Sequence, residues 1–114
     1  MKKVIMILLV GLFSLASFSQ EKKDKNKSIQ FSVNGNCEMC KKRIEKAAFA
    51  VKGVKSADWH IEHKDLHLII DENKCSVADV QKAVAKAGHD AGKVKATDED
   101  YGKLHGCCQY ERKE

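Results

Sequence analysis

The sequence of 114 residues contains no proline, a single tryptophan and two tyrosines. Cis peptide bonds are almost always formed by proline, so any site that depends on a cis-proline is excluded. The formal net charge is +5, but basic and acidic residues are mixed along the chain and no repeat of basic and aromatic residues is present. A nucleic-acid-binding protein typically carries such a basic footprint, and we therefore predict no nucleic-acid partner.

The sequence also lacks the residue groupings on which most enzymes depend. It contains no nucleophile beside a base, no carboxylate pair and no glycine-rich phosphate loop, and its one reactive grouping consists of thiols. We therefore predict a binding protein and not an enzyme.

Residues 1–19 resemble a secretory signal peptide. Lys2 and Lys3 precede an apolar run over residues 4–12, and small residues recur after it up to Ser19. This run is short for a membrane-spanning helix, so we expect cleavage and an exported, periplasmic product without stable membrane insertion. An uncleaved membrane anchor is the alternative interpretation. Residues 20–27 form a charged run without apolar side chains, which is typical of a solvated linker.

Alternating hydrophobicity predicts the strands of the domain. Residues 28–33 alternate polar and apolar side chains, as a half-buried strand does. Residues 54–61 and 66–70 alternate in the same way on either side of a polar turn, which predicts a β-hairpin. Residues 91–96 contain Val94 and are interpreted as a short last strand, with fewer apolar residues to support it.

Two amphipathic helices are predicted between these strands. The first carries apolar residues at helical spacing from Ile44 to Val51 and ends at Gly53. The second begins at the capping residue Ser76 and ends at Gly88. The order β-α-β-β-α-β indicates an α+β, ferredoxin-like sandwich, in which two helices cover one face of a four-stranded antiparallel sheet.

Two thiols, Cys37 and Cys40, stand where the first strand gives way to the first helix. Unpaired N–H groups at a helix start favour thiolate over thiol, and Lys41, Lys42 and Arg43 add positive charge nearby. Two thiolates form a soft and open site that selects Cu(I) and, by the same softness, Hg(II), whereas zinc usually requires four ligands. An open site also allows a partner thiolate to add before the first ligands leave. We therefore predict a soft-metal site from which metal is passed on by thiolate exchange.

The element order, the CxxC of Cys37 and Cys40 and the size of residues 28–96 resemble the heavy-metal-associated domain. This family includes copper chaperones, the amino-terminal domains of copper-pumping ATPases and the periplasmic mercury-binding protein. The resemblance implies that Cys37 and Cys40 are the metal ligands and that the partner is a metal-transporting ATPase or another metal-trafficking protein. In the family motif G-M-x-C-x-x-C a methionine packs under the loop, and Gly35 occupies its position here.

Other interpretations of Cys37 and Cys40 stay open. A structural disulfide across so short a loop stabilises by only about 2 kcal/mol, and five cysteines cannot all pair within a monomer. A thiol–disulfide oxidoreductase also uses CxxC at a helix start, although a thioredoxin-like site faces a cis-proline that this chain cannot supply. A zinc-stabilised interaction module that uses four cysteines is the third interpretation, so Zn(II) stays among the candidate metals.

Residues 97–114 form an extension that has no standard counterpart in the family and carries Cys107 and Cys108. Adjacent Cα atoms are about 3.8 Å apart, below the usual disulfide range, so these thiols are not expected to bridge each other. The ten residues 97–106 span at most about 33 Å, which is enough for a return to the thiol loop. We therefore treat Cys107 and Cys108 as candidate additional metal ligands, against a disordered or intermolecularly oxidised tail.

The remaining candidates are weaker. Cys75 precedes a helix cap and is expected to be buried. His89 follows the second helix and is a candidate ligand or proton donor at the thiol end of the domain. His60 and His67 alternate with core residues and are expected to face solvent, so no site is assigned to them.

Overall fold

The computed structural model describes residues 23–112, so the predicted signal peptide 1–19 lies outside the described residues. The elements follow one another as β1 (Lys27–Ser32), α2 (Glu38–Phe49), β2 (Val54–His60), β3 (Asp65–Ile70), α3 (Val77–Lys86), α4 (Asp98–Gly102) and a 3₁₀ turn, η1 (Gly106–Cys108). Between residues 23 and 112 no helix has the length and apolar character needed to cross a membrane.

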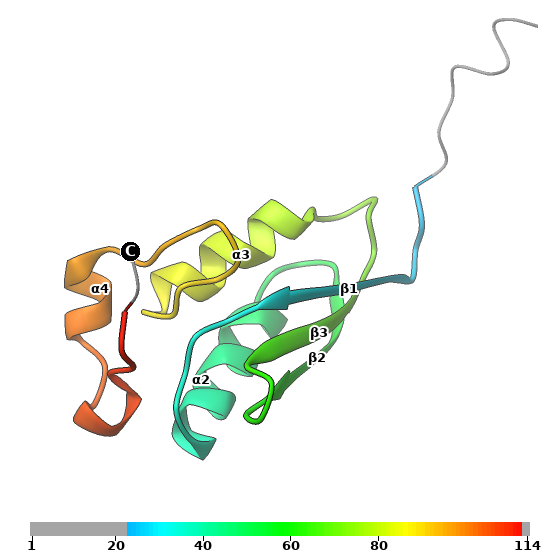
Figure 1. Ribbon diagram of the computed structural model, residues 1–114. Helices are drawn as coiled ribbons and strands as arrows, with labels where there is room; N and C mark the ends of the chain where they lie inside the picture. The colour runs from blue at the N-terminus through cyan, green and yellow to red at the C-terminus, as the bar shows by residue number, and fades with distance from the viewer. Residues whose placement is uncertain (1–22, 113–114) are drawn as a thin grey trace, which may run out of the picture.

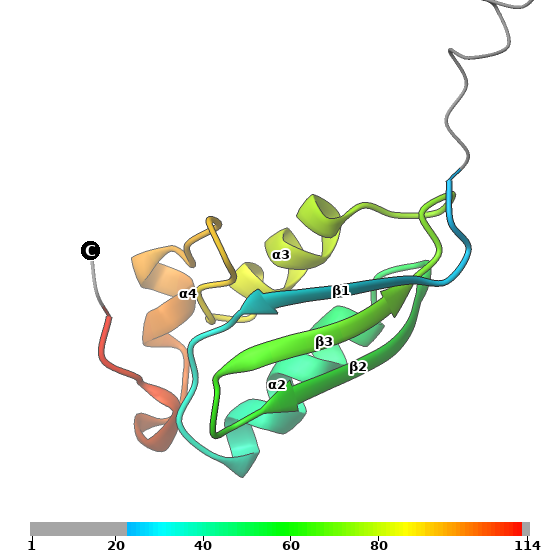
Figure 2. The same ribbon diagram turned by 45° about the vertical axis from the view of Figure 1, so that its right-hand side comes forward.

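The sheet contains three antiparallel strands in the order β1-β3-β2, with β3 in the centre. Leu66, Leu68 and Ile70 of β3 are buried, whereas Asp65 and His67, which alternate with them, point to the other face. Helices α2 and α3 lie together on the buried face, and in the described part of the chain the opposite face carries no helix (Figures 1 and 2). The predicted α+β architecture, with an antiparallel sheet and two covering helices, is therefore confirmed.

The helix ends follow the sequence signals closely. At the start of α3 the Ser76 hydroxyl accepts the Asp79 N–H, and the Asp79 carboxylate accepts the Ser76 N–H, which completes the predicted capping box. Gly53 and Gly88, one after each helix, both have φ of +108°, a conformation that glycine adopts at little cost. These two glycines turn the chain back toward the sheet.

The predicted fourth strand, residues 91–96, is not formed as a strand. Ala91 makes one isolated bridge to Val33, and the backbone groups of Ala91 and Val94 then bond to each other across a tight turn. Gly92 in this turn has φ of +57°, so the chain reverses before an extended run can pair with β1. The described sheet therefore has three strands instead of the four that were predicted.

The core receives side chains from both the sheet domain and the extension. Trp59, Ile44 and Leu66 are among its largest fully buried members. Leu104 and Tyr110 of the extension are also buried and belong to the same apolar cluster. The described part of the extension, residues 97–112, therefore packs against the domain, and we call it the C-terminal clasp.

Candidate metal centre

The start of α2 positions the two cysteines of the loop. Cys37 is the N-cap residue, with extended backbone, and Cys40 lies in the first helical turn. Cys40 is fully buried on the same helix face as Ile44 and Ala48, whereas Cys37 is half-buried. Their Sγ atoms are 3.5 Å apart. The predicted strand–loop–helix junction therefore presents both sulfurs at one point.

The loop is supported from below by an aromatic ring. A Cβ atom on Gly35 would lie only 3.0 Å from the Trp59 ring and 3.1 Å from the Cβ of Cys40. The Trp59 indole is fully buried and donates its Nε1–H to the carbonyl of Val33 at 3.0 Å. Because Trp59 fills the space under the loop, no side chain is needed at residue 35, which accounts for the departure from the family motif.

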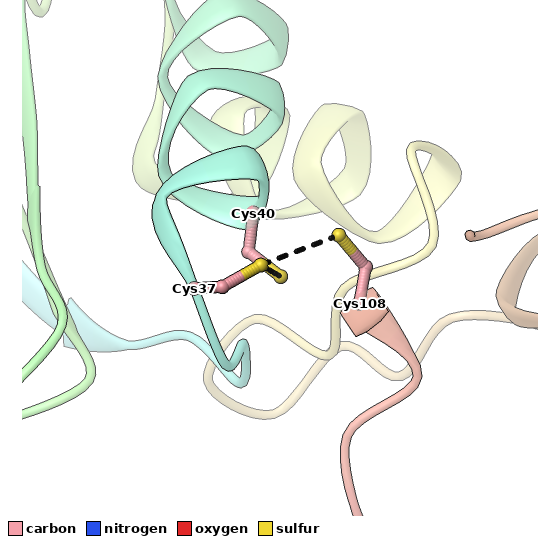
Figure 3. Close-up of side chains that lie close together, drawn as sticks. All are labelled: Cys37, Cys40 and Cys108. Carbon is pink, nitrogen blue, oxygen red and sulfur yellow. Dashed lines mark hydrogen bonds between the residues drawn. The ribbon is translucent and has the colours of Figure 1, made fainter. Parts of the chain in front are cut away.

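A third sulfur reaches this point from the C-terminal clasp. Cys108 Sγ lies 3.8 Å from Cys37 Sγ, and one ligand atom from each of Cys37, Cys40 and Cys108 lies within 4.8 Å of the others (Figure 3). Cys107 is exposed, and its Sγ contacts the Met39 Sδ at 3.5 Å. The sequence offered both cysteines of the extension as candidates, and the structure brings Cys108 to the pair and leaves Cys107 at the edge.

Tyr110 fixes the clasp to the loop that follows α3. Its hydroxyl donates to the carbonyl of Gly88 at 2.9 Å and accepts the N–H of Asp90 at 2.8 Å. Burial raises the pKa of Tyr110 to about 12, so the hydroxyl keeps its proton and can act as the donor. The Tyr101 hydroxyl in turn donates to the carbonyl of Tyr110. These bonds hold the backbone beside Cys108 in place.

A partly buried ion pair closes the other end of the clasp. The Arg112 guanidinium lies 2.9 Å from the Asp90 carboxylate, which is only 6% exposed, and 2.6 Å from the carbonyl of Ala96. It also lies over the Tyr101 ring, 4.9 Å from the centroid. Asp90 additionally accepts the N–H of Ala96 at 2.8 Å. A buried carboxylate requires such partners, so Asp90 and Arg112 depend on each other.

The sulfurs of Cys37 and Cys108 differ in their readiness to ionise. The backbone N–H of Cys40, at the positive end of α2, lowers the pKa of Cys37 to about 7 against the opposing effect of burial. Burial raises the pKa of Cys108, and the neighbouring thiols of Cys40 and Cys37 raise it further. Cys37 is therefore the thiolate available at neutral pH, and Cys108 holds its proton until a cation displaces it.

The spacing of the sulfurs fits a site with three or more ligands better than a linear pair. For a metal–sulfur bond of about 2.3 Å, two ligands in a line lie about 4.6 Å apart, three in a plane about 4.0 Å apart and tetrahedral ligands about 3.8 Å apart. The observed separations of 3.5 Å and 3.8 Å from Cys37 are closer to the planar and tetrahedral values than to the linear one. A soft cation could thus be held by all three thiolates with small side-chain movements.

The basic residues around the loop do not act together. Lys41 Nζ lies 2.6 Å from Glu45 and 2.9 Å from Asp58, so its charge is matched by carboxylates and is not directed at the thiols. Lys42 and Arg43 instead line a groove between α2 and the clasp, together with Met39, Lys46, Ala47, Ala50, Ala87, His105 and Cys108. The basic surface beside the site is therefore this groove.

His89 and Cys75 lie outside the sulfur group. His89 is fully buried, its Nδ1 donates to the carbonyl of Asn34 at 2.7 Å, and its Nε2 has no partner. Burial lowers the pKa of His89, which keeps the ring neutral. Cys75 is buried, as predicted, and touches Gly53 beyond the far end of α2. Both residues therefore support the fold, and His89 holds the loop at Asn34.

Sequence reasoning missed the residues that place the third sulfur. Tyr110, Asp90 and Arg112 act through contacts between segments that no local pattern joins. One signal was present, because the two tyrosines of the chain, Tyr101 and Tyr110, both fall in the extension. Buried aromatic rings in a tail indicate that it packs against the domain.

The fold and the site define the class of the protein: a small α+β domain with a group of cysteines at the start of its first helix. No family model matches the chain. The chain is 29% identical over 55 residues to the copper chaperone CopZ of Staphylococcus haemolyticus, which covers 48% of this chain and 81% of that protein.

Solved structures extend this similarity. Oxidized MerP from Ralstonia metallidurans CH34 is 31% identical with a TM-score of 0.56, over 59% of this chain and 94% of that one. The N-terminal domain of a potential copper-translocating P-type ATPase from Bacillus subtilis, in the Cu(I)-loaded state, is 26% identical with a TM-score of 0.56, over 64% and 92% of the two chains. The chain therefore belongs to the heavy-metal-associated domain family.

Proposed function

We propose that this protein holds Cu(I) through the thiolates of Cys37, Cys40 and Cys108 and passes it to a partner protein by thiolate exchange. The observation that carries the proposal is the convergence of three sulfurs from two distant segments, within 4.8 Å of one another. Thiolates are soft ligands that select Cu(I), and two of the relatives carry copper in their names. Hg(II) and Zn(II) are the alternative cargoes.

The order of events follows from exposure and ionisation. Cys37 is half-buried and its pKa is lowered to about 7, so it binds the incoming cation first. Cys40 lies behind it in the first turn of α2, and Cys108 closes the site after losing its proton. Transfer reverses this order: a partner thiolate adds, Cys108 regains its proton, and Cys37 is the last ligand to leave.

The groove between α2 and the clasp supports a docking role. Lys42, Arg43 and Lys46 line it, and Met39 at its edge is 48% exposed. A basic surface beside the cargo attracts an acidic partner and accelerates their encounter. We propose that the partner is a metal-trafficking protein, such as a metal-transporting ATPase, with an acidic surface around its own thiols. The proposal includes export by residues 1–19 to the periplasm.

The test is an anaerobic Cu(I) titration of the reduced protein against a calibrated chelator. Wild type is compared with a Cys37→Ser, Cys40→Ser variant, and with Cys75→Ser as a control that removes a cysteine outside the site. We expect tight binding that is lost in the double variant and kept in the control. If wild type does not compete for Cu(I), the proposal fails. Turnover of a disulfide substrate would then support a thiol–disulfide oxidoreductase.

A second measurement tests delivery. Cu(I)-loaded protein is mixed with an acceptor domain that carries its own CxxC, and the two are separated and analysed for copper. We expect copper to move to the acceptor faster than it moves to a chelator of equal affinity. Equal rates would mean that copper is released as a free ion, which would contradict thiolate exchange.

A further inference from the structure

The open face of the sheet carries a second group of ligand-type side chains, which contains no thiol. In the register of β2 and β3, Asp58 faces His67 and His60 faces Asp65. Because side chains alternate along a strand, these four residues share one face, opposite to the helices. The four residues form a square with alternating corners: each imidazole has one carboxylate beside it on its own strand and another on the neighbouring strand.

The contacts within this square converge on Asp65. One Asp65 carboxylate oxygen lies 3.3 Å from His60 Nδ1, and the other lies 3.3 Å from His67 Nε2. The rings of His60 and His67 are 4.5 Å apart at their centroids. One ligand atom from each of His60, Asp65 and His67 falls within 4.8 Å of the others. Two imidazoles and one carboxylate therefore point to the same small volume.

The distances within the group are those of long hydrogen bonds, which a cation could replace. A separation of 3.3 Å exceeds the usual N–H···O range of about 2.7–3.2 Å. Ligands on a tetrahedral zinc ion, with bonds of about 2.0–2.1 Å, lie about 3.4 Å apart. The two Asp65–imidazole contacts have about this length, but they end on different oxygens, Oδ1 for His60 and Oδ2 for His67. A small rotation of the carboxylate would therefore be needed to direct one oxygen and both imidazoles at a single cation.

The surroundings of Asp65 are those of an oriented ligand. Its side chain is only 16% exposed and accepts a hydrogen bond from Gln30 on the neighbouring strand β1. Asp58 lies 3.1 Å from the other ring nitrogen of His60, in the position of an outer partner that fixes the ring. The imidazoles of His60 and His67 are 40% and 44% exposed, which leaves the site open to a hydrated cation.

We propose that His60, Asp65 and His67 form a second metal site, which binds a divalent cation of zinc-like chemistry. Imidazole and carboxylate ligands suit Zn²⁺ and related divalent ions, whereas the thiol group suits Cu(I). The two sites therefore differ in the charge and softness of the cation that each one takes. They also lie apart, since the thiols are on the helix-covered side of the molecule and the imidazoles on the open face of the sheet.

The test follows the imidazole nitrogens by NMR while Zn²⁺ alone is added to the complete, reduced protein. The thiols can also take up Zn²⁺, so the ring resonances, not the total zinc bound, report on this site. We expect the nitrogens of His60 and His67 to shift together in a single saturable step. Those of His63, which is exposed and outside the square, should shift only at higher Zn²⁺. His105 lines the groove beside Cys108 and would respond to zinc on the thiols, so it is not a reference ring. Parallel shifts of the His60, His63 and His67 rings would overturn the proposal.

Variants give a second, independent readout. A His60→Gln, His67→Gln variant should lose the saturable step. Asp65→Asn should lower the affinity for Zn²⁺ at least about tenfold, and the ring nitrogens of His60 and His67 still report binding in that variant. A His63→Gln, His105→Gln variant is the matched control and should retain wild-type affinity. Wild-type affinity in the His60 and His67 variant would contradict the proposal. The Cu(I) titration of the His60→Gln, His67→Gln variant should match that of wild type. A negative result at the imidazole site would therefore leave the proposed thiol site untouched.

Discussion

Cys40 and Cys108 are both buried beside Cys37, but the chain brings them there in different ways. Cys40 is three residues from Cys37, and the first turn of α2 alone sets the distance between their sulfurs. Cys108 is 71 residues from Cys37 and is held by the tyrosine bonds and the Asp90–Arg112 pair of the clasp.

Cys40 is therefore placed by a local sequence motif, whereas Cys108 is placed by packing between distant segments. A pair set by helix geometry survives changes elsewhere, provided that the helix forms. A ligand set by long-range contacts depends on each of them, and it can be removed without disturbing the pair. The two-sulfur and three-sulfur states of the site can therefore be compared in one protein.

The largest effect is expected from removing the third sulfur. Cys108→Ser should weaken Cu(I) binding about a hundredfold, or ~2.7 kcal/mol, because one of three metal–sulfur bonds is lost. Cys107→Ser, its neighbour in the chain, should leave affinity unchanged. X-ray absorption spectroscopy of the Cu(I) forms should show three sulfur ligands in wild type and two in Cys108→Ser. Equal affinities of the two variants would show that the clasp supplies no ligand.

Loosening the clasp without touching sulfur should have a smaller effect. Tyr110→Phe leaves the Asp90 N–H and the Gly88 carbonyl without their buried partner, at a cost of about 1–3 kcal/mol in the free energy of unfolding. Urea denaturation measures this change. Lys103→Gln alters only an exposed pair of the same segment, with Nζ 3.9 Å from Glu99, and should leave stability unchanged. A neutral Tyr110→Phe would show that the hydroxyl does not anchor the clasp.

The support under the loop can be tested by restoring the residue that the family motif carries. Gly35→Met should destabilise the protein by about 1–2 kcal/mol, because the Trp59 ring already fills the space. In a Trp59→Leu background the same substitution should cost less, which a thermodynamic cycle from denaturation curves would reveal. Additive costs would indicate that residue 35 and Trp59 do not compete for the same volume.

The smallest effect expected concerns the reactivity of Cys37. Its pKa of about 7 predicts that alkylation of the reduced, metal-free protein at Cys37 rises with pH around 7 and then levels off. In the urea-unfolded protein the same residue should titrate near its ordinary value of 9.0. At pH 7 the gain in rate should be only about fivefold, since a more acidic thiol is also a weaker nucleophile. Mass spectrometry of the Cys37 peptide over a pH series gives both profiles.

The features that the sequence predicted correctly are those that local geometry determines. The Ser76–Asp79 capping box and the turns at Gly53 and Gly88 depend on neighbouring residues alone. The placement of Cys37 and Cys40 at the start of α2 has the same origin. In each case the pattern lies within one or two helical turns.

The features that were missed depend on contacts between distant segments. The reversal at Gly92 is held by a hydrogen bond from its N–H to the carbonyl of Ser32 on β1, a contact that the local sequence does not reveal, so residues 91–96 resembled a strand. Lys41 was read as a charge beside the thiols, but Asp58 on β2 binds it instead. The adjacent cysteines 107 and 108 could not be ranked from the sequence either, because Cys108 turns inward in a segment that is held by the long-range bond from Tyr110 to Gly88.

Few side chains hold the C-terminal clasp against the domain, and this would limit the residence time of bound Cu(I). A segment fastened by a few buried groups opens locally at a lower free energy than a central strand, and hydrogen exchange detects such opening. Each opening would withdraw Cys108 while β3 and α2 stay folded, and would leave the cation on two sulfurs. The residence time of Cu(I) would then be set by the opening equilibrium of residues 97–112. An acceptor that binds the open form would shift this equilibrium and shorten the residence time.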